Sequence, residues 1–171
     1  MTVKGIEILI LPFEGTAKGD LQHLIQGLAE VGMQASLLPE AAIPAQAYNP
    51  QRDQYVADVM LHRTREAGVH LPVLGVTEVD LYVAGLNYVF GMADLPGHAA
   101  VISLHRLRLD ADADCFRDRA VKEAVHEMGH TFGLKHCDDR HCVMYFSFSL
   151  ADTDRKGKAY CPQCQARLAQ A

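Results

Sequence analysis

The sequence has no long apolar runs, no internal repeats and no excess of positive charge, and these absences limit what the protein can be. No stretch approaches the roughly 18 apolar residues of a transmembrane helix, so we expect no membrane span. The formal net charge is −5, which argues against nucleic acid or an anionic membrane surface as a partner. With no repeat or low-complexity segment visible, the 171 residues are expected to form one ordinary domain.

A secretory signal is also missing. The apolar run from Ile6 to Phe13 contains Glu7, and no small-residue cleavage site follows it, so we interpret it as a first β-strand. Five cysteines in a chain without such a signal favour reduced thiols and metal binding over disulfides. We therefore expect a cytoplasmic protein.

The composition, with 49% hydrophobic and 22% charged residues, is that of a globular domain. Apolar periodicity predicts strands over 6–12, 34–38, 73–77, 87–92 and 99–104, and helices over 20–31, 51–67 and 116–132. Strands alternate with helices at first and later neighbour one another. This order predicts an α+β fold of the α/β type, with helices flanking a mixed, twisted sheet.

One short stretch, VHEMGHTFGLKHCDDRHCVM at Val125–Met144, holds four of the nine histidines and two of the five cysteines. His126 and His130 are four residues apart, so on a helix they lie on one face and can reach one zinc ion. Glu127 lies on the flank of that face, where it can reach a zinc-bound water rather than the metal. A bare HExxH also occurs by chance, as an exposed helix with two histidines.

The residues after the helix strengthen the zinc interpretation. Gly133 can adopt a positive φ at the end of a helix and reverse the chain, which would bring His136 back to the same metal as a third ligand. Three histidines and a water make an open, catalytic type of zinc site. An Asp third ligand, at Asp138 or Asp139, is less well spaced. A thermolysin-like site fails because no Glu follows Glu127.

The other cysteines suggest a second metal site. Cys137 and Cys142 are close in sequence, and Cys161 and Cys164 form a CxxC pair. Four thiolates in two close pairs suit a tetrahedral structural zinc, and the alternative is four unrelated buried or redox cysteines. We therefore predict two Zn²⁺ per chain, one catalytic and one structural.

The combined pattern, HExxHxxGxxHC-x4-C-V-M followed by CxxC, resembles the archaemetzincin family of the metzincin clan of zinc metalloproteases. The segment NYVFGMADLPGHAA, residues 87–100, is also similar to that family. The resemblance implies a single compact metzincin-like domain with an edge strand above an active-site cleft, and Met144 as the residue of a Met-turn below the zinc. Some metzincins have a zinc-touching Tyr two residues after that Met, where this chain has Phe146.

Within one domain over residues 1–171, we expect the sheet and active-site helix in residues 1–133. Residues 134–171 are expected to form a small zinc-stapled subdomain with the third His, the Met-turn and the four cysteines. Weaker candidates remain. Asp110, Asp112 and Asp114 alternate like a calcium loop but lack its Gly and terminal Glu. Cys115 is expected to be a buried thiol.

The sequence thus predicts a zinc-dependent metallopeptidase that hydrolyses peptide bonds by Glu-assisted attack of a zinc-bound water. The expected partner is a peptide or protein substrate, with no nucleic acid and no membrane, and the expected state is a monomer. The alternative is a zinc-stabilised peptide- or protein-binding module whose metzincin-like site is weakly active or inactive. A nucleic-acid role for the four-cysteine unit is disfavoured by the acidic net charge.

Overall fold

A five-stranded sheet forms the centre of the computed structural model, which describes residues 5–68 and 70–170. Its strand order is β2 (Met33–Leu37), β1 (Ile6–Pro12), β5 (Val73–Thr77), β8 (Ala99–Ser103) and β7 (Gly91–Ala93). The first four strands run parallel, and β7 pairs antiparallel with β8 at one edge. The sheet is therefore mixed, as the sequence predicts.

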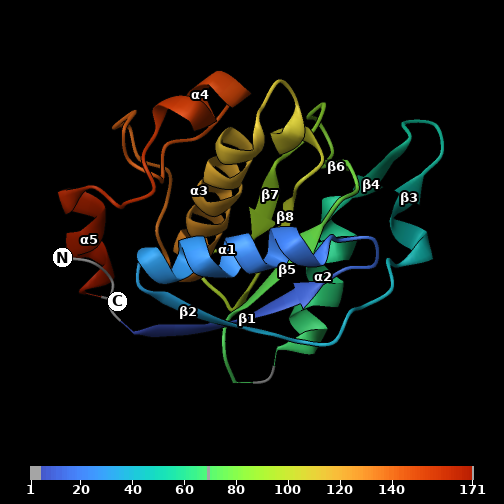
Figure 1. Cartoon of the computed structure of the whole chain (residues 1–171), viewed down its shortest axis with the longest axis horizontal. Coiled ribbons are helices and arrows are strands. Elements are labelled where there is room, and N and C mark those ends of the chain that lie inside the picture. The colour runs from blue at the N-terminus through green and yellow to red at the C-terminus, as the bar shows by residue number, and fades with distance from the viewer. Residues whose placement is uncertain (1–4, 69, 171) are drawn as a thin grey trace.

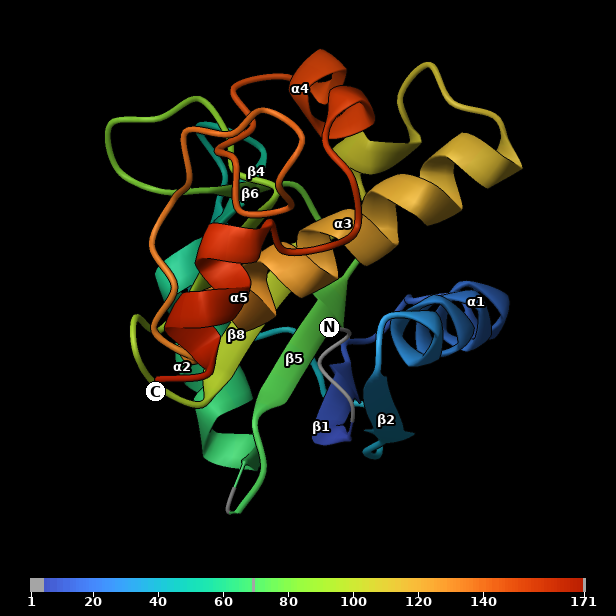
Figure 2. The same cartoon turned by 90° about the vertical axis from the view of Figure 1, so that its left-hand side faces the viewer.

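Helices cover both faces of this sheet (Figures 1 and 2). On one face lie α1 (Lys18–Glu30) and α3 (Ala113–Thr131), and on the other lies α2 (Ala57–Ala67). Alternation along β1 supplies both cores, since Ile8 and Ile10 join the α1 and α3 side while Leu11 joins the α2 side. Both β5 and β8 are buried throughout, as expected for parallel strands covered on two faces.

Smaller elements complete the fold. A three-stranded sheet comprises β3 (Tyr48–Asn49), β4 (Gln54–Val56) and β6 (Leu81–Tyr82), and short 3₁₀ turns span Ala45–Ala47 and Arg106–Arg108. After α3, the described residues form two further helices, α4 (Leu150–Arg155) and α5 (Pro162–Leu168), and Figure 2 shows this segment lying over α3. Among the described residues, no helix is both long and apolar enough to cross a membrane.

Several predicted boundaries are corrected by the structure. The helix expected from Gln51 begins at Ala57, because residues 54–56 form β4 between β3 and β6. Helix α3 begins at Ala113 rather than Phe116, because Asp112 caps it, with its carboxylate accepting a hydrogen bond from the Cys115 amide at 2.9 Å. Asp112 therefore serves as a helix cap.

The strand expected over 87–92 is also shorter than predicted. Only Gly91–Ala93 pairs with β8, while Val89 forms an isolated bridge to Leu81. The Asn87 carbonyl instead accepts hydrogen bonds from the side chains of Arg52 and Gln54, at 2.9 Å each. The Phe90 carbonyl still accepts a hydrogen bond from the Ser103 amide of β8 at 2.8 Å, so residues 86–88 leave the sheet ladder while residues 86–90 form one wall of a pocket.

Candidate active site

Helix α3 carries the HExxH residues in its last two turns and is buried along most of its length. His126, Glu127 and His130 are only 3%, 6% and 8% exposed. The helix packs against β8, β7 and α1, which accounts for the apolar face formed by Val121, Ala124 and Met128. A chance HExxH would be expected on an exposed helix. The motif here is buried, which argues against that interpretation.

The helix ends in a glycine reversal, as the sequence predicts. Gly133 has φ +90°, its amide donates to the His130 carbonyl at 2.9 Å, and the Leu134 amide donates to the Gly129 carbonyl at 2.9 Å. This pair of bonds is a Schellman motif. It turns the chain back, so that the His136 ring lies 5.3 Å from the His126 ring and 4.8 Å from the His130 ring, centroid to centroid.

The ring nitrogens of His126 and His130 are arranged as a metal site requires. Each ring places Nδ1 2.7 Å from a backbone carbonyl, that of Val143 for His126 and that of Leu134 for His130. A carbonyl only accepts, so each Nδ1 carries the proton and each Nε2 is left with a lone pair. The two Nε2 atoms lie 3.2 Å apart. Two nitrogens on one tetrahedral zinc lie about 3.3 Å apart, so the pair fits zinc.

The third histidine joins the same group, with all three ligand nitrogens within 4.8 Å of one another. Burial lowers the pKa of His126 and of His130 below the usual range. The pKa of the more exposed His136 is lowered to about 4, mainly by desolvation and in second place by the charge of the neighbouring His130. All three imidazoles are thus neutral near pH 7, which is the form that binds a metal.

Met144 lies directly beneath this part of the helix and is fully buried. A Cβ built on Gly129 would lie 2.4 Å from the Met144 sulfur, so only glycine at this position allows the two to pack this closely. The preceding carbonyl, of Val143, is the one that accepts from His126. The segment predicted to be a Met-turn therefore contacts the helix at Gly129 and at the His126 ring.

Four of the five cysteines form a second cluster, with their sulfurs within 4.8 Å of one another. None of the five forms a disulfide. The sulfurs of Cys137 and Cys161 are 3.7 Å apart and those of Cys142 and Cys164 are 3.8 Å apart, close to the roughly 3.8 Å expected for two thiolates on one tetrahedral zinc. The Cys142 sulfur also accepts hydrogen bonds from two backbone amides, at 3.3 and 3.4 Å, which favour a thiolate.

Glu127 lies between the helix and the edge strand β7. Burial raises the pKa of its carboxyl well above the usual range, with Glu123 adding to the rise and Lys156 opposing it. Strand β7 approaches closely because residue 91 is glycine: an added Cβ would lie 2.7 Å from Cγ and Oε1 of Glu127 and 2.8 Å from the Val101 carbonyl. Glu127 lines two adjoining cavities, one of which also contains His130 and His136.

A buried ion pair lies one turn before Glu127 and was not anticipated from the sequence. Lys156 Nζ is 2.9 Å from Glu123 Oε1, with the two side chains 0% and 4% exposed. The Lys156 ammonium also donates to the Tyr145 carbonyl at 3.4 Å, and the Thr153 hydroxyl donates to Glu123 at 3.3 Å. The pair thus connects α3 to α4 and to the residue after Met144.

The weaker sequence candidates lie outside both clusters. Neither Asp138 nor Asp139 is in the histidine group. His141, the fourth histidine of the stretch Val125–Met144, is exposed with its Nδ1 3.7 Å from Asp139. Cys115, expected to be buried, is half-buried with its sulfur 3.7 Å from Asp154. Glu123 shares a helix face with Glu127 and could have been found by its i, i+4 spacing. Lys156 is 33 residues further on and carries no local signal.

Comparison with known proteins assigns the chain. The sequence profile described as "Peptidase family M54" matches residues 38–170. The chain belongs to peptidase family M54. It is 46% identical over 148 residues to the archaemetzincin of Methanopyrus kandleri, covering 86% of this chain and 82% of that one. It is 42% identical over 168 residues to the archaemetzincin of Methanocaldococcus jannaschii, covering 95% and 93%. The resemblance to archaemetzincins is confirmed, and this M54 chain is a zinc metallopeptidase.

Solved structures agree with this assignment and with the expected fold. The crystal structure of the archaemetzincin of Methanopyrus kandleri superposes with a TM-score of 0.87 at 39% identity, covering 96% of this chain and 94% of that one. That of Archaeoglobus fulgidus, complexed with malonate, gives 0.83 at 38% identity and covers 95% and 99%. A zinc-dependent peptidase of Methanocorpusculum labreanum gives 0.83 at 31% identity and covers 96% and 100%.

The approach of β7 to Glu127 yields a first prediction. In Gly91→Ala the new methyl group meets both the Glu127 side chain and a backbone carbonyl, so strand or carboxylate must move. A displacement of about 1 Å at a reacting group costs on the order of 10²-fold in rate. We expect peptidase kcat to fall by that factor while zinc content stays at the parent value.

Gly19→Ala is the matched control, since a Cβ there meets nothing within 4 Å and lies in α1. It should retain parent activity. Parent-level turnover in Gly91→Ala would show that the close approach of β7 is not needed.

The buried pair yields a second prediction. Lys156→Met leaves Glu123 buried without its cation and should lower the free energy of unfolding by about 3–5 kcal/mol. Adding Glu123→Leu removes the orphaned charge, so the double variant should regain most of that loss. Urea unfolding of the zinc-loaded proteins measures the free energy of unfolding of the parent, the two single variants and the double variant.

Lys18→Met, which changes an exposed lysine, should shift the free energy of unfolding by no more than about 0.5 kcal/mol. If the double variant is as unstable as the sum of the two single variants, the pair does not act as a unit.

Proposed function

We propose that His126, His130 and His136 hold the catalytic zinc of this metallopeptidase and that Glu127 is its general base. The observation that carries the proposal is the pair of Nε2 atoms 3.2 Å apart, each with its other ring nitrogen bonded to a carbonyl. Two buried lone pairs that face each other are unfavourable by themselves, and a cation that binds both nitrogens would relieve this cost.

Glu127 performs the proton transfers in this proposal. Bound zinc would polarise the scissile carbonyl and lower the pKa of a coordinated water to about 7. Glu127 then accepts the proton of the attacking water and delivers it to the departing amine. The raised pKa of the Glu127 carboxyl, which burial causes, makes its carboxylate a stronger base than a free one and so favours acceptance of the proton.

The substrate is proposed to bind as an extended peptide along β7. Within the described residues, β7 pairs with β8 alone, so its outer edge can accept a further strand. That edge runs past Glu127 and the histidines. Phe146 packs its ring 4.9 Å from the His136 ring and has no hydroxyl, so it supplies no donor to a developing oxyanion.

The four cysteines are proposed to hold a structural zinc that completes one domain over residues 1–171. Its sheet and active-site helix belong to residues 1–133 and its zinc-stapled part to residues 134–171. The backbone amide of Cys137 donates to the Met144 carbonyl at 3.0 Å, so this part also holds the Met-turn. We further propose a cytoplasmic monomer that acts on peptides or proteins and uses no nucleic acid.

Metal content tests the two-zinc proposal. Purified parent protein should contain close to two zinc per chain. Cys164→Ser should lose the structural zinc and, because Cys137 follows His136 directly, should also lower occupancy of the histidine site and the melting temperature together. Elemental analysis and thermal unfolding measure the three quantities.

Cys115→Ser is the control, since Cys115 lies outside the cluster, and it should keep two zinc. A parent value that stays near one after zinc is added would contradict the second site. A Cys164→Ser protein with parent stability and a full histidine site would contradict the coupling.

Substitution of the base tests the mechanism and separates the enzyme from a zinc-stabilised binding module. Glu127→Gln keeps the size of the side chain but cannot accept the proton. Zinc content should be unchanged, and turnover of a peptide cut by the parent should fall by on the order of 10²–10⁴-fold.

His130→Ala, in contrast, should lose the metal itself. Normal turnover with normal zinc in Glu127→Gln would exclude Glu127 as the base. Failure of the zinc-loaded parent to cut any peptide in a library would favour the binding module.

A further inference from the structure

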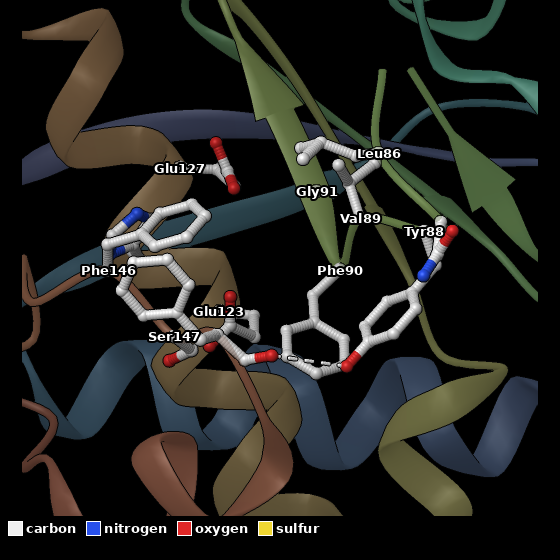
Figure 3. A pocket seen from close by; sticks show the side chains of 12 residues that line it. Leu86, Tyr88, Val89, Phe90, Gly91, Glu123, Glu127, Phe146 and Ser147 are labelled. Atoms are coloured by element: carbon white, nitrogen blue, oxygen red, sulfur yellow. Dashed lines mark hydrogen bonds between the residues drawn. The ribbon is translucent and has the colours of Figure 1, made fainter. Parts of the chain in front are cut away.

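A pocket of about 240 Å³ opens beside Glu127 (Figure 3). Three segments line it: residues 86–91, residues 146–148, and Glu123, His126 and Glu127 of α3. It shares Gly91, His126, Glu127 and Phe146 with the adjoining cavity that contains His130 and His136. A peptide lying along β7 with its carbonyl at this junction would therefore place one neighbouring side chain in the pocket.

The pocket suits a single apolar side chain. Its walls carry two aromatic pairs, Tyr88 with Phe90 at 5.3 Å and Phe146 with Phe148 at 4.6 Å between ring centroids. Its volume lies below the roughly 300–1,000 Å³ of pockets that hold a whole drug-sized ligand. The carboxylate of Glu123 also lines it, but that charge is paired with Lys156, so it does not select a cation.

One hydrogen bond connects the two walls. The Tyr88 hydroxyl donates to the Phe148 carbonyl at 3.3 Å, and in Figure 3 this bond lies at the end of the pocket away from Glu127. The distance is longer than the 2.7–2.8 Å or so typical of O–H···O bonds, and Phe148 is 75% exposed, so the contact is a weak one at the solvent edge of the pocket.

Each partner is positioned from behind by an independent contact. The Arg106 guanidinium lies 4.2 Å from the centre of the Tyr88 ring and is itself held by Asp80 at 2.7 and 2.8 Å. The Phe148 amide donates to the Asp152 carboxylate at 3.1 Å. Both walls are thus supported outside the pocket, and the Tyr88–Phe148 bond is the link between them.

We propose that Tyr88 sets the upper size limit of this pocket: its hydrogen bond to the Phe148 carbonyl closes the far end, so that the enzyme accepts apolar side chains up to the length of Phe beside the scissile bond. The proposal rests on the proposed peptidase function and adds the side-chain class that the site selects.

A peptide series tests it on the zinc-loaded full chain. Peptides carry Ala, Leu, Phe or biphenylalanine at one or other position next to the cleaved bond. At one of the two positions the parent should prefer Leu to Ala by on the order of 10–100-fold in kcat/KM, and Phe to biphenylalanine by about 10-fold or more. Tyr88→Phe, which removes only the hydroxyl, should reduce the preference for Phe over biphenylalanine about 10-fold. Tyr88→Ala should abolish that preference.

Tyr48→Phe is the matched control. It removes a hydroxyl bonded to Asp53 at 2.9 Å outside the pocket, and its ratios should equal those of the parent. Unchanged Phe-to-biphenylalanine ratios in both Tyr88 variants, or no apolar preference at either position, would overturn the proposal while leaving the peptidase function intact.

A binding assay separates failure of the pocket from failure of the enzyme. The chain contains no Trp, so a peptide with Trp at the varied position reports its own binding by fluorescence. The zinc-loaded Glu127→Gln protein is titrated with this peptide, and the Ala, Leu, Phe and biphenylalanine peptides compete.

In one outcome no peptide is cut, the Phe peptide still competes better than the biphenylalanine peptide, and adding Tyr88→Phe to the Glu127→Gln protein makes their affinities more alike. This outcome would support the pocket proposal and contradict the peptidase proposal. If no peptide is cut and none binds, both fail.

Discussion

Two buried hydrogen bonds govern the arrangement of the active site. His126 and His130 each bond Nδ1 to a carbonyl of the segment that follows their own helix. These bonds set the tautomer, point both Nε2 atoms at one position, and require the chain to return under the helix. The glycine reversal at Gly133 makes that return, because a positive φ is available there at no steric cost. The third histidine, the Met-turn and the cysteine cluster all follow from this change of direction.

The same buried helix creates an electrostatic cost that the fold must offset. Burial raises the pKa of Glu127, and a second carboxylate, Glu123, lies one turn away on the same face. Lys156 reaches this region from the C-terminal end of α4 and neutralises Glu123. Since a buried charge without a partner is strongly destabilising, the lysine lets Glu123 remain beside the pocket. The cation also holds the Tyr145 carbonyl, so one side chain serves both the charge balance and the path of the chain after Met144.

Local sequence signals predicted the metal-type clusters well and the pocket not at all. The spacing of His126 and His130 depends only on helix geometry, and the reversal depends on one glycine, so both are readable from a few residues. Tyr55 and Val56 fit helical spacing equally well, and only their pairing with β3 and β6 shows that they are strand residues. The contact of Tyr88 with Phe148 spans 60 residues, and nothing near either residue indicates it. A contact between residues so far apart in the sequence leaves no periodic pattern of residues from which it could be predicted.

The adjacency of His136 and Cys137 also bears on how the protein is made. In the sequence, Cys161 and Cys164 follow every other residue of the two clusters. The loop from Cys137 to Met144 is closed by one hydrogen bond, which the Cys137 amide donates to the Met144 carbonyl. Under the proposed ligand sets, a nascent chain on the ribosome that has exposed HExxH still lacks two thiolates needed to hold the third histidine in place. We therefore expect hydrolytic activity to appear late in synthesis, after residues 161–164 have joined the fold.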